Sequence, residues 1–163
     1  MKKIRKLILA CIMVVIVSGI LIFKYHLSNI DSNAYLSSSA RGQKSFEVYD
    51  GNGEGSKNSQ KFNFKKFDGR WSLMKFKSSK GNEINISDNT KVGTGKFYIV
   101  VLDSKYNIVA KKNEISDKGN IKFTTPKDGE YVIRIAGEKA SGKFDISVNA
   151  NKNVDISHLD FWS

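Results

Sequence analysis

Residues 130–136 read Glu-Tyr-Val-Ile-Arg-Ile-Ala, and residues 143–149 read Lys-Phe-Asp-Ile-Ser-Val-Asn. In both stretches apolar residues recur at every second position, which is the period of a β-strand with one buried face. The two stretches are separated by residues that include glycine, so the sequence predicts two short strands here. The side chains predicted to face the core are those of Tyr131, Ile133, Ile135, Phe144, Ile146 and Val148.

Short apolar segments separated by turn residues continue back to residue 45, and no stretch after residue 28 keeps a helical apolar period. Turns every 8–12 residues or so are typical of sandwiches. We therefore predict an all-β fold, an antiparallel β-sandwich of jelly-roll or immunoglobulin-like type, with about eight or nine short strands. Besides the two stretches above, strands are predicted at residues 46–49, 61–67, 71–77, 83–87, 97–102, 108–111 and 120–125.

The chain of 163 residues carries a net charge of +11, which raises the question of a nucleic-acid partner. Five of its 27 basic residues precede the first carboxylate, Asp31, and the rest are interleaved with acidic residues. Only four basic residues are arginines, the side chain that best recognises phosphates and bases. The surplus predicts a lysine-rich surface and no nucleic-acid partner.

Residues 7–23 form an uncharged apolar run of seventeen residues, preceded by four basic residues among the first six. As a helix the run would be about 25 Å long, near the lower limit for a bilayer core of about 30 Å. The preceding charges predict a cytoplasmic N-terminus. The sequence thus predicts one N-terminal transmembrane helix, and a single-pass membrane protein whose C-terminal domain is extracellular.

Two alternatives for this segment remain open. It could be a cleaved secretory signal, which would leave a secreted protein. Alternatively, residues 8–11 loosely resemble a lipoprotein box, in which Cys11 would be lipidated. Each alternative exports the rest of the chain. Because Cys11 is the only cysteine, the sequence excludes disulfides within the chain and cysteine-based metal clusters.

Composition divides the chain into four parts. Residues 1–28 are the membrane anchor or signal segment, and residues 29–44 are rich in serine and asparagine and predict a solvated stalk. Residues 45–149 are the predicted sandwich, which is long enough to fold around one core. Residues 150–163 form a C-terminal tail.

Three segments of the second half carry a family resemblance: Gly-Lys-Phe-Tyr-Ile-Val-Val-Leu-Asp at 95–103, Asp-Gly-Glu-Tyr-Val-Ile-Arg-Ile at 128–135 and Gly-Lys-Phe-Asp-Ile-Ser-Val at 142–148. Together they resemble the bacterial pre-peptidase C-terminal type of β-sandwich. The resemblance covers about residues 60–149 and implies an accessory module of a secreted or surface protein, without an active site. With the lysine and asparagine bias, the chain resembles exported proteins of Gram-positive bacteria.

The segment containing Asp128, Gly129 and Tyr131 is also similar to the tyrosine corner of immunoglobulin-like domains. That resemblance implies that the Tyr131 hydroxyl hydrogen-bonds to nearby backbone where its strand begins. Both resemblances imply a sandwich architecture.

Asp50, Asn52 and Glu54 are spaced like the start of a calcium-binding loop. The twelfth position of such a loop requires a bidentate carboxylate, and here it is Lys61. These three residues are therefore a weak calcium candidate, and the alternative is a flexible glycine-rich turn. We expect no metal ion and no cofactor.

The sequence selects no catalytic residue. His26 follows the apolar run and His158 lies in the tail, so neither is placed to activate a serine on the sandwich. Two carboxylates could meet across strands, but spacing alone selects no pair. We therefore expect a protein that is not an enzyme.

Aromatic residues are the remaining candidates for ligand or partner contacts. Trp71 lies in an aromatic and lysine-rich stretch that could stack sugars or bases, or could pack in the core. Phe161 and Trp162 end the tail, where they either dock on the sandwich or contact a partner.

The preferred hypothesis is a non-catalytic, membrane-anchored extracytoplasmic β-sandwich module. It would contact the membrane through residues 7–23 and bind a surface protein, a peptide or a cell-wall glycan. One alternative is a small exported hydrolase that uses carboxylates. Another is an auxiliary subunit of a membrane complex.

Overall fold

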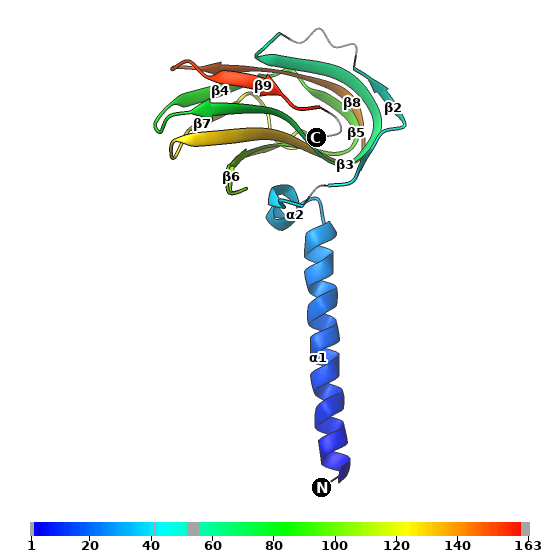
Figure 1. Ribbon diagram of the computed structural model, residues 1–163. Coiled ribbons are helices and arrows are strands. Elements are labelled where there is room, and N and C mark those ends of the chain that lie inside the picture. The colour runs from blue at the N-terminus through cyan, green and yellow to red at the C-terminus, as the bar shows by residue number, and fades with distance from the viewer. Residues whose placement is uncertain (1, 41, 52–55, 161–163) are drawn as a thin grey trace.

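The computed structural model describes residues 2–40, 42–51 and 56–160 (Figure 1). It consists of a long N-terminal helix, a short second helix and nine strands. In chain order these elements are α1 (Lys2–Ser28), α2 (Asn33–Ser37), β1 (Lys44–Ser45), β2 (Val48–Asp50), β3 (Ser59–Ser78), β4 (Glu83–Asp88), β5 (Lys91–Asp103), β6 (Ile108–Asn113), β7 (Ile121–Thr124), β8 (Gly129–Ala150) and β9 (Asp155–His158).

Every strand pairing is antiparallel, and the strands build two layers that share β3, β5 and β8. In the first layer, the first half of β8 lies between the second halves of β3 and β5, with β9 and β6 at the edges. In the second layer, the rest of β8 lies between the first half of β3 and β4, with β2 and β7 at the edges. The predicted all-β class is therefore confirmed.

The shared strands turn from one layer into the other at a common corner, and β3 and β8 are seen curving together in Figure 1. In β3 the register shifts on both sides of Phe67, and in β5 it shifts between Val92 and Lys96. Such bulges bend a strand while the ladder continues on either side. Four residues near them have left-handed backbone: Lys66, Gly69, Gly95 and Lys139.

This corner corrects the predicted strand boundaries. The stretches 61–67 and 71–77 belong to one strand, β3, and the stretches 130–136 and 143–149 belong to one strand, β8. The residues between these stretches, which the sequence predicts to be turns, form bulges within continuous strands. Composition alone does not distinguish a bulge from a chain reversal, because glycine serves both.

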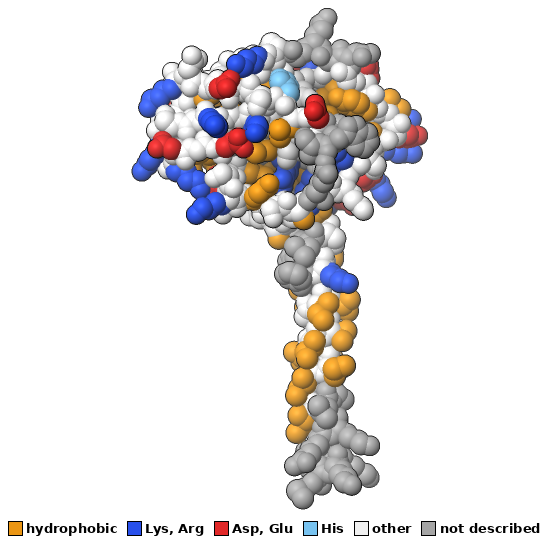
Figure 2. Space-filling model, viewed as in Figure 1, with side chains coloured by type: hydrophobic (Ala, Val, Ile, Leu, Met, Phe, Trp, Pro, Cys, Tyr) orange, Lys and Arg blue, Asp and Glu red, His pale blue; other side chains and the backbone are white. Residues whose placement is uncertain are grey.

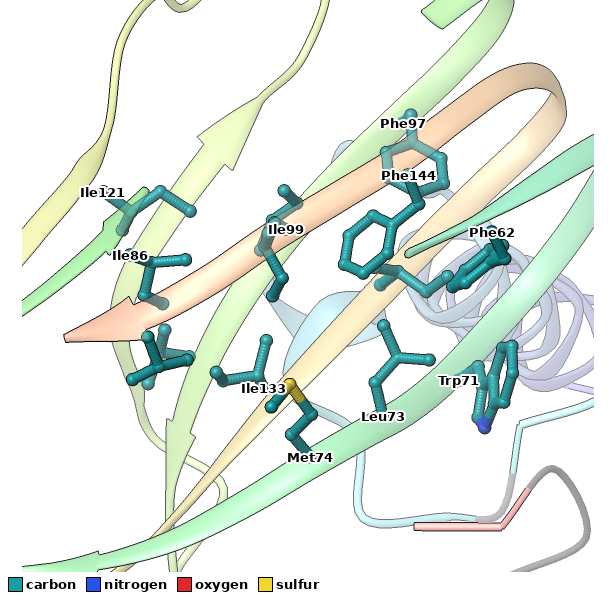
Figure 3. Packing of buried hydrophobic residues seen from close by; sticks show 14 of the residues in the cluster. Phe62, Trp71, Leu73, Met74, Ile86, Phe97, Ile99, Ile121, Ile133 and Phe144 are labelled. Atoms are coloured by element: carbon teal, nitrogen blue, oxygen red, sulfur yellow. The ribbon is translucent and has the colours of Figure 1, made fainter. Parts of the chain in front are cut away.

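The core lies between the two layers, and aromatic rings dominate it at the corner (Figure 3). The rings of Phe64 and Phe97 stack with centroids 4.9 Å apart, and those of Phe62 and Phe144 also lie 4.9 Å apart. Farther from the corner the filling is aliphatic. The aliphatic residues labelled in Figure 3 include Leu73, Ile86, Ile99, Ile121 and Ile133.

Part of the predicted tail is a strand. β9 pairs with β3, placing Ile156 opposite Phe76, and Ile156 is buried. The Leu159 amide continues this contact by donating to the Leu73 carbonyl at 2.8 Å. This strand is not predictable from the sequence, because the tail has too few alternating positions to show a strand period.

The stretch predicted to be a solvated stalk packs on the sandwich. Ile30 and Leu36 are 4% and 0% exposed, and they cover the outer face of the first layer beside Tyr98, Val100 and Leu102. Leu36 lies in α2, whose N-cap Ser32 accepts a hydrogen bond from the Tyr35 amide at 3.1 Å. The prediction of a solvated stretch is therefore wrong for these residues. Their burial gives no signal in the sequence, because two isolated apolar side chains show no strand or helix period.

α1 projects away from the sandwich, and the apolar side chains described on it face outward (Figures 1 and 2). Exposure reaches 52% at Ile8 and 69% at Val15. Among the residues that the structure describes, no helix is both long and apolar enough to cross a membrane. The predicted transmembrane helix is thus not found within the described residues.

Two glycines provide a test of the corner. Gly95 and Gly81 have similar left-handed φ angles, 76° and 77°, but a Cβ at Gly95 would lie 2.4 Å from the carbonyl oxygens of Glu138 and Lys139. A Cβ at Gly81 would meet nothing within 4 Å. Gly81→Ala should cost about 1–2 kcal/mol for the backbone conformation. Gly95→Ala should cost roughly 1–3 kcal/mol more, because the corner must move apart.

The measurement is urea unfolding of the full chain in detergent, followed by tryptophan fluorescence. Equal losses of stability in the two variants would show that the strands are not packed backbone to backbone at this corner.

Candidate functional site

The weak calcium candidate is only partly within the described chain. Asp50 ends β2 and is exposed, whereas Asn52 and Glu54 lie outside the described residues. The described residues contain no group of three or more His, Cys, Asp or Glu side chains that could hold a metal ion. The calcium interpretation gains no support from this geometry and stays a prediction.

Trp71 lies in the core. It is 3% exposed, and its ring lies 5.6 Å from that of Phe62, 5.7 Å from that of Tyr49 and 6.0 Å from that of Phe46. A ring in this position cannot form an open platform for a sugar or base. The other two predicted contact residues, Phe161 and Trp162, lie outside the described residues.

Tyr131 lies where β8 begins and is fully buried. Its hydroxyl donates to the Lys127 carbonyl at 2.6 Å. Gly129 provides the left-handed φ of 146° that starts the strand, and Asp128 Oδ1 accepts from the Lys80 amide at 2.6 Å. These contacts fasten the entry to β8 and present no reactive group, so their role is structural.

Two arginines on the outer face of the first layer hold residues 29–40, which contain α2, and we call them the arginine clasp. Arg134 is 6% exposed and donates from one guanidinium nitrogen to the carbonyls of Leu36 at 3.1 Å and Ser38 at 2.8 Å. Arg70 donates to the Tyr35 carbonyl and lies 4.6 Å from the Tyr35 ring centroid. The clasp thus satisfies carbonyls that the end of a helix leaves without partners.

Asp31, which precedes α2, holds the start of residues 29–40. Its carboxylate accepts from Lys96 Nζ at 2.6 Å and from the Tyr98 hydroxyl at 2.8 Å. The hydrogen bond from Lys96, together with that from Tyr98, lowers the pKa of Asp31. Burial, together with Asp31, raises the pKa of Tyr98 to about 12. Both groups therefore keep the protonation states that this contact needs at neutral pH.

A hollow of about 380 Å³ lies beside the arginine clasp, and we call it the cationic hollow. Burial and the neighbouring Arg70 lower the pKa of Arg134 to about 10, which still leaves the guanidinium charged at neutral pH. Glu130 is the one acidic residue in the lining, and it pairs with Lys75 at 3.3 Å. The basic residues of the lining are Lys44, Arg70, Lys75 and Arg134.

A second cluster of charged side chains lies in the interior of the sandwich and consists of Asp88, Lys112 and Glu114. The register places Asp88 opposite Ile146 and Lys112 opposite Ile99, and both isoleucines are core residues. The exposed fractions of the three side chains are 0%, 9% and 3%. Lys112 Nζ contacts Asp88 Oδ2 directly and lies 3.2 Å from Glu114 Oε2.

The surroundings of this cluster shift the ionisation of all three groups. Burial, together with a hydrogen bond to Asp88, raises the pKa of Glu114 to about 8. Burial opposes ionisation of Asp88, but hydrogen bonds from Glu114 and Lys112 outweigh it and lower the Asp88 pKa. Burial likewise opposes the charge on Lys112, yet Asp88 and Glu114 raise its pKa. At neutral pH the cluster therefore holds one ammonium, one carboxylate and one protonated carboxyl group.

Two neighbouring buried carboxyl groups are what the hydrolase alternative requires, but a substrate must also reach them. The three side chains are at most 9% exposed, so the cluster faces the interior, where it can act on groups of its own chain.

The arginine clasp and the Asp88–Lys112–Glu114 cluster are not among the sites predicted from the sequence. Asp88 continues the alternation of Ile84 and Ile86, so the strand period could have placed it inside. Lys112 and Glu114 are two residues apart and therefore lie on the same face of the strand. Which face that is depends on a register shift between β5 and β6, and no local sequence pattern shows this shift. No sequence signal could have identified the clasp, because its acceptors are backbone carbonyls.

No family model matches this sequence, and no curated protein matches it.

The arginine clasp can be tested by proteolysis. Arg134→Leu removes two hydrogen bonds from a charged donor, one to the Leu36 carbonyl in α2 and one to the Ser38 carbonyl after it, each contributing about 1.5–3 kcal/mol. Local opening should become at least tenfold more frequent. Chymotryptic cleavage after Tyr35 and Leu36 should accelerate accordingly. Lys143→Leu, which changes a half-buried basic residue on the same strand, is the control, and equal cleavage rates in the two variants would refute the clasp.

Proposed function

We propose that this chain is a non-catalytic, membrane-anchored module whose β-sandwich lies outside the cytoplasm and binds a peptide, a protein or a cell-wall glycan. The observation that carries the proposal is the exposure of α1. Its described large apolar side chains are about half exposed or more, up to 69% at Val15, and they face several directions (Figure 2). Exposed apolar surface of this extent is costly in water and favourable in hydrocarbon.

The sequence around these residues supports the same proposal. Residues 7–23 contain no charge, and the basic residues before them favour a cytoplasmic N-terminus. In that orientation the sandwich is on the outer side of the membrane. The sandwich would also lie close to the helix, because α1 ends at Ser28 and Ile30 is already buried against the first layer.

The cationic hollow is the surface that we propose for ligand contact. Its four basic side chains and single carboxylate favour an anionic ligand, such as an acidic peptide or an anionic cell-wall glycan. Tyr106 and Leu159 add an aromatic and an apolar wall. The hydrogen bond of Tyr131 to the Lys127 carbonyl supports the finer likeness to immunoglobulin-like sandwiches.

Alkaline carbonate extraction of membranes tests the anchor. The full chain should stay in the membrane pellet, and Val15→Lys should release a several-fold larger fraction, because a lysine in the middle of the proposed anchor, residues 7–23, would cost about 2.5–3.5 kcal/mol in the bilayer. The matched control is Ile115→Lys, which replaces an exposed isoleucine of the sandwich. Release of the unaltered chain by carbonate would overturn the proposal.

A further inference from the structure

The Asp88–Lys112–Glu114 cluster joins the two layers of the sandwich from within. Asp88 ends β4 in the second layer, whereas Lys112 lies in β6 at the edge of the first. Lys112 Nζ is in direct contact with a carboxylate oxygen of Asp88. An amine and a carboxyl group are thus held in contact by two separately positioned strands, away from water.

Such an arrangement favours condensation of the two groups. Burying an ion pair removes the hydration of both charges, and their attraction often does not compensate for it fully. Conversion of the pair to a neutral amide removes both charges and expels one water molecule. Fixed proximity also supplies an effective concentration of up to about 10⁵–10⁸ M for reactions within one molecule.

Glu114 provides the proton transfer that condensation requires. Its Oε2 atom lies 3.2 Å from Lys112 Nζ, and the side chain is 3% exposed. The other carboxyl oxygen of Glu114, Oε1, is also buried, and the proton of the carboxyl group is shared with Asp88. Because the raised pKa keeps Glu114 protonated at neutral pH, the cluster holds a general acid beside the carboxylate to be activated.

We propose that Lys112 Nζ and Asp88 Cγ become joined by an intramolecular amide bond, with Glu114 as the acid–base group of the reaction. The proposal does not depend on the membrane anchor or on the cationic hollow. The reaction would occur once in each chain, on the chain itself.

The reaction is balanced without a cofactor. Glu114 gives its proton to the Asp88 carboxylate and accepts one from the Lys112 ammonium. The neutral amine attacks Asp88 Cγ and forms the N–C bond. As the C–O bond breaks, one Asp88 oxygen leaves with two protons as water, and Glu114 ends protonated. One ammonium and one carboxylate have then become one amide and one water, with no electron gained or lost.

Peptide mapping of the full chain, purified in detergent, tests the proposal. Trypsin cannot cleave after an acylated lysine, so residues 112–118 should stay together and be attached to residues 81–91. This branched peptide should be lighter by one water molecule than the sum of its two linear parts. Recovery of unmodified 81–91 together with 113–118 in the unaltered chain would overturn the bond.

Variants separate the bond from the role of Glu114. Glu114→Gln keeps the size of the side chain but removes the exchangeable acid, and should lower the branched fraction at least tenfold. Asp145→Asn breaks a half-buried pair with Lys143, outside the cluster, and should leave the branched fraction unchanged. If Glu114→Gln forms the bond as completely as the unaltered chain, the role of Glu114 is refuted. If that variant does not fold, the unaltered chain and Asp145→Asn still decide whether the bond exists.

Discussion

The pairing of β8 with β3 along both layers is the constraint on which the rest of the structure depends. Both strands pass through the corner without ending, because bulges and left-handed residues bend them while the ladder continues. β5 follows β8 through the same corner and carries β6 with it, while β4 pairs with the far end of β8. The positions of Asp88 and Lys112, which no local interaction brings together, follow from this pairing.

The outer face of the first layer depends on the same strands in another way. Arg134 comes from β8 and Arg70 from β3, next to the corner, so the ladder places both where they can hold residues 29–40, which contain α2. The two arginines thereby connect the sandwich to the chain leading from α1. In the proposed function this connection keeps the cationic hollow near the membrane, because its lining includes Ser39 and Ala40 of that segment.

Sequence reasoning succeeded where burial follows a local period and failed where it depends on distant partners. The alternation of Ile84 and Ile86 predicts β4, and the same period could have placed Asp88 inside. Gly69 marks the β3 corner, but a glycine does not distinguish a bulge from a turn. The burial of Leu36 could not have been predicted, since it depends on a surface built by β5 and β8, more than fifty residues away.

Hydrogen exchange through the corner of β8 tests the central claim most directly. If β8 is one strand, amides of residues 137, 138 and 140–142 should be protected together with those of the strand on either side, because these residues have ladder partners in β3 or β5. The exposed residues 118 and 119, in the connection after β6, provide the reference for unprotected backbone. Exchange at these corner residues as fast as at 118 and 119 would mean that two separate hairpins meet there, and would contradict the account.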